Sequence, residues 1–132
     1  MLHIQPVFTL DLPELQPYRT LRRQDKHRRE RIFVAEGEKT LRRLLETPFV
    51  LTSVLLTPDW LAIFEPLLQV RSEEIHVFVA EKATLENLIG FTMFQGLMAV
   101  AKIPAAPTLE EILVRSPKPG LFVATDGVSN AD

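Results

Sequence analysis

The apolar residues of this 132-residue chain change their spacing several times, from helical intervals to short continuous runs and back. Apolar residues three and four positions apart predict a helix with one buried face, whereas a short continuous apolar run predicts a buried strand. This rule predicts helices at residues 11–29, 38–46, 57–68 and 81–88. It predicts strands at residues 32–35, 49–56, 75–80 and 96–101.

Helices and strands therefore alternate through residues 1–102, and this alternation predicts the α/β class. The predicted strands are nearly continuous apolar runs, as expected where helices cover both faces of a largely parallel sheet. We expect residues 1–102 to form one domain, a three-layer α/β/α sandwich with a mixed, largely parallel sheet.

The rest of the chain is organised differently. Residues 103–107, Ile-Pro-Ala-Ala-Pro, predict a stiff and extended linker. Residues 108–114 then have helical spacing, and the apolar run 121–125 predicts a strand that leads into an Asp-Gly turn. One helix and one strand cannot enclose a core, so we expect residues 108–132 to be the start of a second domain.

Composition excludes several classes of chemistry. The absence of cysteine excludes disulfides, thiolate metal sites and a cysteine nucleophile, and it suits the cytoplasm. The three histidines, His3, His27 and His76, lack the spacing of metal ligands. Glycine-rich phosphate loops and serine-nucleophile motifs are missing too, so we expect no catalytic residue here. No apolar run approaches the roughly 20 residues that cross a bilayer, and no secretory signal is recognisable.

Charge is concentrated in one quarter of the chain, although the net charge is only −2. Residues 19–43 hold ten of the fifteen Lys and Arg residues and carry +6, whereas residues 44–132 carry −6. On the predicted helix 11–29, bases three and four positions apart form one stripe. An ordinary solvated helix face is the alternative, but clustered bases favour phosphate binding because they release counterions. The candidate RNA-binding residues in this region are Arg22, Arg23, Lys26, Arg28, Arg29 and Arg31.

Two short motifs add two further candidates. At Glu36 and Gly37 a predicted strand ends and a helix begins, which places Lys39 beside exposed backbone N–H groups. Gln95 enters the strand 96–101, and its amide can donate to and accept from a ribose or a base edge. A purely structural role is the alternative for both motifs, with Gln95 tying a loop to the backbone. Lys39 and Gln95 are therefore candidate RNA-binding residues.

Together these motifs resemble the substrate-binding domain of SpoU (TrmH-type) RNA ribose 2′-O-methyltransferases. The family shows a basic stretch, here Lys-His-Arg-Arg at 26–29, and a Phe-x-x-Glu-Gly turn, here at 33–37. About sixty residues later it shows a Gln-Gly-x-x-Ala-Val strand, here at 95–100. Residues 11–18 are similar to the lead-in of some members. Residues 121–128 are similar to the first strand and turn of the family's knotted SPOUT methyltransferase domain, although Ser-Asn-Ala-Asp at 129–132 departs from its usual Asp-Pro.

The resemblance implies a fold shared with kink-turn-binding ribosomal proteins and a role in recognising rRNA or tRNA. It implies that the parent enzyme uses S-adenosylmethionine and forms a homodimer through its catalytic domain. The catalytic and cofactor positions of the family lie after residue 132, so this chain is expected to bind no cofactor and to be inactive. A stand-alone RNA-binding module is one alternative, and a protein-interaction domain that binds an acidic partner is another.

Overall fold

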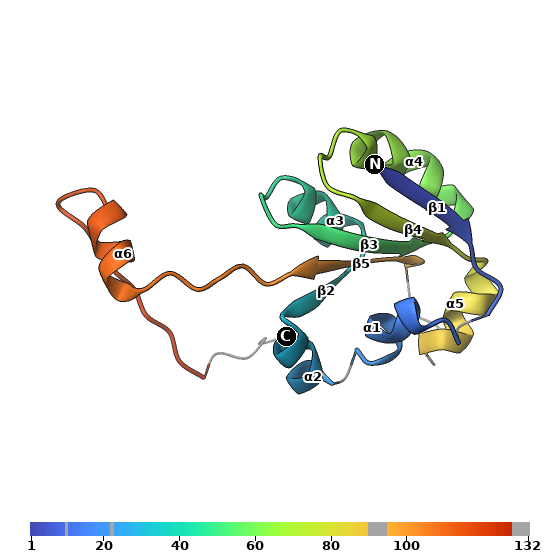
Figure 1. Ribbon diagram of the computed structural model, residues 1–132, viewed down its shortest axis with the longest axis horizontal. Coiled ribbons are helices and arrows are strands. Elements are labelled where there is room, and N and C mark those ends of the chain that lie inside the picture. Colours follow the sequence, from blue (N-terminus) through green and yellow to red (C-terminus); the bar gives the residue numbers. More distant parts are fainter. Residues whose placement is uncertain (10, 22, 90–94, 128–132) are drawn as a thin grey trace.

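The computed structural model describes residues 1–9, 11–21, 23–89 and 95–127 (Figure 1). A five-stranded sheet forms its centre, with the strand order β1-β4-β3-β5-β2. The strands are β1 (Leu2–Pro6), β2 (Ile32–Glu36), β3 (Leu51–Leu56), β4 (Ile75–Val79) and β5 (Leu97–Lys102). Strand β4 pairs in parallel with β1 and β3, whereas β5 pairs antiparallel with β3 and β2. The sheet is therefore mixed, as the sequence predicts.

Helices cover both faces of this sheet. The helical elements are the 3₁₀ turn η1 (Pro13–Leu15), α1 (Gln16–Arg19), α2 (Gln24–Glu30), α3 (Glu38–Leu45), α4 (Pro58–Gln69), α5 (Lys82–Ile89) and α6 (Leu109–Arg115), of which α6 lies away from the sheet with all its residues exposed. Helices α3 and α4 lie on one face and η1, α1 and α5 on the other, while α2 lies beside β2 (Figure 1). This arrangement confirms the α/β/α sandwich. Among the described residues, no helix is long and apolar enough to cross a membrane.

Each face of the sheet has its own core, and β5 contributes to both. Toward α3 and α4, Ala99 and Ala101 belong to a buried cluster with Leu41 and Phe64. Alanines leave room for the larger side chains of the facing helices, so the layers interdigitate. The cluster is fully buried at all four positions.

On the opposite face, Tyr18 fixes α1 to the sheet. Its hydroxyl shares a hydrogen bond of 2.7 Å with the Ser53 hydroxyl of β3, and its ring packs in a cluster with Met98 and Val100. Burial raises the pKa of Tyr18 well above its ordinary value. The phenol therefore stays protonated and keeps this buried hydrogen bond at any physiological pH.

The single helix predicted at 11–29 is wrong, because the chain turns between α1 and α2. The Thr20 hydroxyl donates to the carbonyl of Gln16 and shares a hydrogen bond of 3.0 Å with Nε2 of His27. A straight helix would carry residues 24–30 into solvent, since the apolar spacing ends at Leu21. The turn instead buries His27, which is only 6% exposed.

The two ends of the chain also differ from the prediction. Strand β1 is missing from the predicted elements, because it lies at an edge of the sheet and four of its five residues are exposed. The predicted strand 121–125 is wrong, because no described strand lies beside it. Leu121, Phe122 and Val123 remain 90%, 54% and 81% exposed. The predicted helix 108–114 is confirmed as α6, which begins at a capping box formed by Thr108 and Glu111.

A buried ion pair holds the loop between α3 and β3. The Arg71 guanidinium donates to the carbonyls of Leu45, Thr47 and Phe49 at 2.7–3.2 Å. It also pairs with the Glu73 carboxylate at 2.6 Å, and both side chains are less than 20% exposed. All three carbonyls lie in the segment that leads into β3, so the pair fixes where β3 enters the sheet.

The stability of the domain is expected to depend on pH through Glu73. Burial alone would raise the pKa of Glu73, but hydrogen bonds from Arg71 and the backbone, with the charge of Arg71, hold it below its usual range. The stabilisation that the ionised Glu73 carboxylate contributes to the folded state is complete above the unfolded pKa of about 4.3, and it is lost as the pH falls through the lower folded pKa.

Replacing Glu73 with Gln should therefore cost about 2 kcal/mol of unfolding free energy near pH 7, and progressively less as the pH falls from the unfolded pKa through the lower folded pKa. Urea unfolding of both proteins at pH values on either side of this range measures this difference. A difference that stays constant across the range would contradict the ion pair.

Candidate functional site

Two of the sequence motifs meet at one end of the sheet. Strand β2 ends at Glu36, which pairs with Met98 near the start of β5. The N–H of Gly37 donates to the carbonyl of Leu97 at 3.0 Å. The Glu-Gly turn and the Gln-Gly strand, almost sixty residues apart in sequence, are therefore one structural unit.

Gln95 supports the turn from the side. Its Oε1 accepts the backbone N–H of Glu38 at 3.3 Å, at the first turn of α3. Gly37 has φ of 87°, and a Cβ there would lie 3.0 Å from the same Oε1. The positive φ therefore favours glycine at this position, and a Cβ there would also push the Gln95 amide away from the turn. Gln95 takes the structural role that the sequence left open, while Lys39 lies exposed one residue beyond the bond.

Three of the predicted basic residues, Lys26, Arg28 and Arg29, lie on α2, and Arg23 and Arg31 flank it as its cap residues. Arg29 pairs with Asp25 at 3.1 Å and Lys26 lies 3.9 Å from Glu30, so these two bases are partly neutralised. Arg23 and Arg28 are exposed and form no ion pair with any described residue. Arg22 lies outside the described residues. The stripe expected from one continuous helix is replaced by a compact basic surface on α2, defined by residues 23, 26, 28, 29 and 31.

Arg31 closes this basic surface in an unusual conformation. It ends α2 with φ of 54°, a left-handed conformation that residues other than glycine seldom adopt. Its guanidinium donates to the carbonyl of Pro104 at 3.0 Å, and its own carbonyl accepts the N–H of Ile103 at 2.8 Å. The bonds to the linker hold Arg31 in place, so its charge is fixed beside α2.

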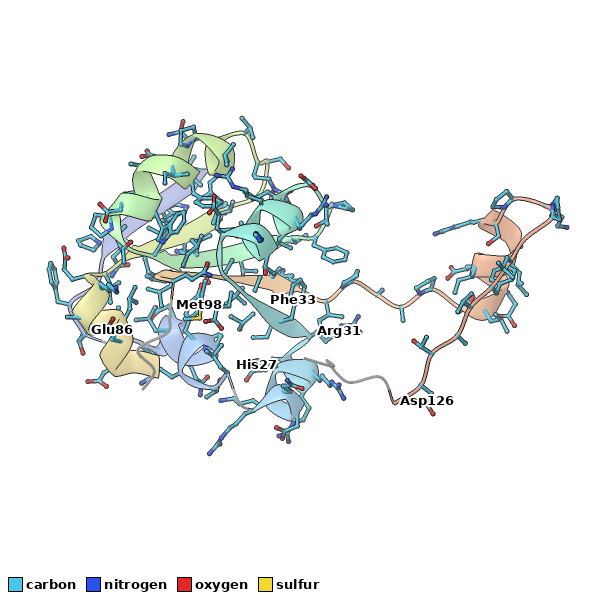
Figure 2. All side chains as sticks on the ribbon, turned by 180° about the vertical axis from the view of Figure 1, so that it is seen from behind. His27, Arg31, Phe33, Glu86, Met98 and Asp126 are labelled. Carbon is cyan, nitrogen blue, oxygen red and sulfur yellow. The ribbon has the colours of Figure 1, made fainter. Side chains whose placement is uncertain are left out.

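The candidates occupy two places at opposite ends of β2. The basic surface lies where β2 begins, and Gln95 and Lys39 lie where it ends, about 16 Å away at a rise of about 3.3 Å per residue. A groove of about 360 Å³ runs between them, lined by Arg28 and His27 of α2 and by Val34 and Glu36 of β2. Two of its lining residues, His27 and Phe33, are labelled in Figure 2. Strand β2 is the edge of the sheet, so its outer backbone groups face this groove.

A second groove lies beyond the end of the sheet where the parallel strands finish. It has a volume of about 580 Å³ and includes Thr57, Trp60, Lys82 and Gln95. Sequence reasoning missed Thr57 and Trp60, because Thr57 was interpreted only as the start of a predicted helix and Trp60 belongs to no motif. The signal available in the sequence was the order of the elements, since ligands of α/β sheets bind at the carboxyl ends of parallel strands.

Metal binding has no support in the described part of the chain. His3 and His76 stack with ring centroids 5.1 Å apart, because β1 and β4 pair them directly. The structure forms no group of three or more metal-ligating side chains among the residues it describes. His27 is buried and bonded to Thr20, so it acts in packing.

Comparison with known proteins identifies the fold. No family model matches the chain, and no curated protein matches it at a significant level. An AdoMet-bound rRNA methyltransferase from Sinorhizobium meliloti matches with a TM-score of 0.61 and 15% identity, over 79% of this chain and 38% of that one. An RNA 2′-O ribose methyltransferase matches with a TM-score of 0.59 and 21% identity, over 87% of this chain and 42% of that one. A protein from Porphyromonas gingivalis described as a TrmH-family RNA methyltransferase matches with a TM-score of 0.55 and 24% identity, over 76% of this chain and 38% of that one.

These likenesses establish an α/β fold that occurs in RNA methyltransferases. The chain spans about two fifths of the length of each of the three proteins. At identities below 25%, shared structure defines the fold and leaves activity to be argued from the residues.

Removal of the Gln95 side chain is expected to loosen the turn. In Gln95→Ala the N–H of Glu38 loses its acceptor, at a cost of about 0.5–1.5 kcal/mol. Hydrogen exchange should show faster exchange of the Glu38 amide, while Gln95→Glu, which keeps the acceptor oxygen, should protect it. Equal protection of that amide in wild type and Gln95→Ala would show that Gln95 does not hold the turn.

Proposed function

We propose that this chain is the RNA-recognition domain of a SpoU (TrmH-type) RNA ribose 2′-O-methyltransferase. Three observations support the class: the fold shared with RNA methyltransferases, the four motifs in family order, and the meeting of two of them at Gly37. The observation that carries the RNA role is the basic surface of α2, which lies beside an open groove. Its bases sit close together on a chain with net charge −2, so they form a local attraction for phosphates.

The residues present do not fit the cofactor of such an enzyme. Residues 121–127 resemble the first strand and turn of the methyltransferase domain, but Leu121 and Val123 are more than 80% exposed. No described strand packs beside them to build the wall of a cofactor pocket. We therefore derive no methyl-transfer step from this chain, and the proposed role is to bind RNA for a catalytic domain outside it.

Charge reversal on α2 tests the proposed RNA surface. Arg28→Glu with Arg29→Glu should weaken RNA binding. The slope of the logarithm of the binding constant against the logarithm of the salt concentration should become shallower by about 0.7–0.9 for each phosphate that the variant no longer neutralises. Both side chains are exposed, so the free energy of unfolding should change by no more than about 0.5 kcal/mol for each substitution. Filter binding to rRNA and tRNA fragments at several salt concentrations measures the slope.

The matched control reverses two exposed bases away from α2. Arg43→Glu with Arg115→Glu makes the same change in net charge, on α3 and α6. It should leave RNA affinity near that of wild type. Equal reductions of affinity in the two double variants would mean that only overall charge matters, and the α2 surface would be ruled out.

The purified chain is expected to bind no S-adenosylmethionine and to methylate no RNA. Isothermal calorimetry with the cofactor, at protein concentrations well above those needed for RNA binding, measures the first point. Saturable binding of one cofactor per chain would contradict the proposal that the cofactor site lies elsewhere.

A further inference from the structure

The groove beyond the carboxyl ends of the parallel strands has the position of a ligand site. Strand β3 leads into α4 on one face of the sheet, and β4 leads into α5 on the other. The two connections leave in opposite directions, and such a divergence forms a crevice where α/β proteins bind ligands. At about 580 Å³, the groove lies within the range of about 300–1,000 Å³ typical of small-molecule sites.

Trp60 gives this groove an aromatic wall. It lies on the first turn of α4, half-buried, with its indole N–H donating to the carbonyl of Gln95 and its ring 5.8 Å from that of Phe64. These contacts hold the indole in one orientation along the groove. A fixed aromatic face is the feature on which unpaired bases stack.

Gly96 packs directly against the two residues that form this groove. It has φ of 74°, and a Cβ there would lie 2.9 Å from the Thr57 methyl and 3.5 Å from the Trp60 ring. Any side chain would therefore press on both residues. The buried glycine thus lets Thr57 and Trp60 pack against the backbone just before β5, which holds both side chains in place.

Thr57 supplies a polar group that the fold does not use. It stands at the N-cap of α4, where threonine usually accepts a hydrogen bond from the backbone, yet its side chain makes no capping bond. Its side chain lines the groove although the residue is only 8% exposed. Within the described residues its hydroxyl is therefore available to a ligand in the groove.

The charges around the groove select against a bare anion. Asp59 and Glu81 are its two carboxylates, and Lys82 is its one base, already within 3.9 Å of Glu86. Free phosphate would be repelled by this excess of negative charge. A nucleoside suits it, because the base and the ribose carry N–H and O–H donors that carboxylates accept.

We propose that this groove binds one unpaired ribonucleotide of the RNA, with its base stacked on Trp60. The Thr57 hydroxyl and the carboxylates of Asp59 and Glu81 bond its polar edges. This inference rests on the proposed function, because it assigns to the same domain a second contact with RNA, distinct from the phosphate-binding surface on α2.

Trp60 is the only tryptophan of the chain, so its fluorescence reports on this groove alone. Titration with the nucleosides adenosine and uridine should quench its emission in a saturable way, with adenosine stronger because its base has the larger ring system. Ribose, which has the sugar without the base, should leave the emission unchanged. Quenching by ribose, or none by either nucleoside, would overturn the inference.

A matched pair of variants separates stacking from packing. Both Trp60→Phe and Trp60→Leu lose the bond to the Gln95 carbonyl, but only Phe keeps an aromatic face. Affinity for a single-stranded RNA oligonucleotide should be roughly 5- to 100-fold lower in the Leu variant than in the Phe variant. Equal affinities, with both variants folded by circular dichroism, would overturn the inference.

The α2 variants keep the two proposals distinguishable. Arg28→Glu with Arg29→Glu should weaken binding of the oligonucleotide and leave quenching by the nucleosides unchanged. If the nucleosides fail to quench while this double variant still binds RNA more weakly than wild type, the inference is overturned and the proposed function stands. If the nucleosides quench but RNA does not bind, the proposed function is overturned, and with it the assignment of this groove to RNA.

Discussion

The structure depends on the insertion of β5 between β3 and β2. Strand β5 is the last strand along the chain, yet it lies inside the sheet and pairs antiparallel with both neighbours. Five of its six residues are buried. Without β5, β2 has no partner and α3 has no surface on which to pack. Two sequence motifs are brought together by the same pairing, because Gly37 can reach the carbonyl of Leu97 only when β2 and β5 are in register. One antiparallel register therefore fixes the core and the candidate site together.

The same register separates the charges of the molecule. Strand β2 runs from the basic surface on α2 to the Glu-Gly turn, so the clustered bases lie near its start and the hydrogen-bonding groups of the turn lie near its end. An RNA strand that follows the groove beside β2 would pass from the positive surface toward a region rich in carboxylates. Under the proposed function, affinity and selectivity would come from different parts of the domain, as is usual where backbone contacts position a nucleic acid and base contacts specify it.

Sequence periodicity predicted the buried elements and failed where burial is partial. Strands β3, β4 and β5 are continuous apolar runs, and each lies within one or two residues of its predicted range. Strand β1 was missed because only one of its faces is partly covered, and strand 121–125 was predicted because an apolar run carries no information about its partner. Charge spacing predicted a long helix to residue 29, but a basic stripe does not hold a helix where nothing is buried. Of the candidate site, the sequence proposed Gln95 and the bases of α2 as RNA-binding residues, and that role stays a prediction, whereas Trp60 and Thr57 become candidates only through the crevice that the topology creates.

The bonds between Arg31 and the linker have a mechanical consequence. Because Ile103 and Pro104 are tied to the end of α2, free rotation of the chain can begin only at Ala105. From there to the start of α6 the tether is a few residues long and spans at most about 3.3–3.6 Å per residue. The start of α6 therefore stays within about 18 Å of Pro104, however the tether bends. The anchor of this tether is Arg31, the residue that ends α2.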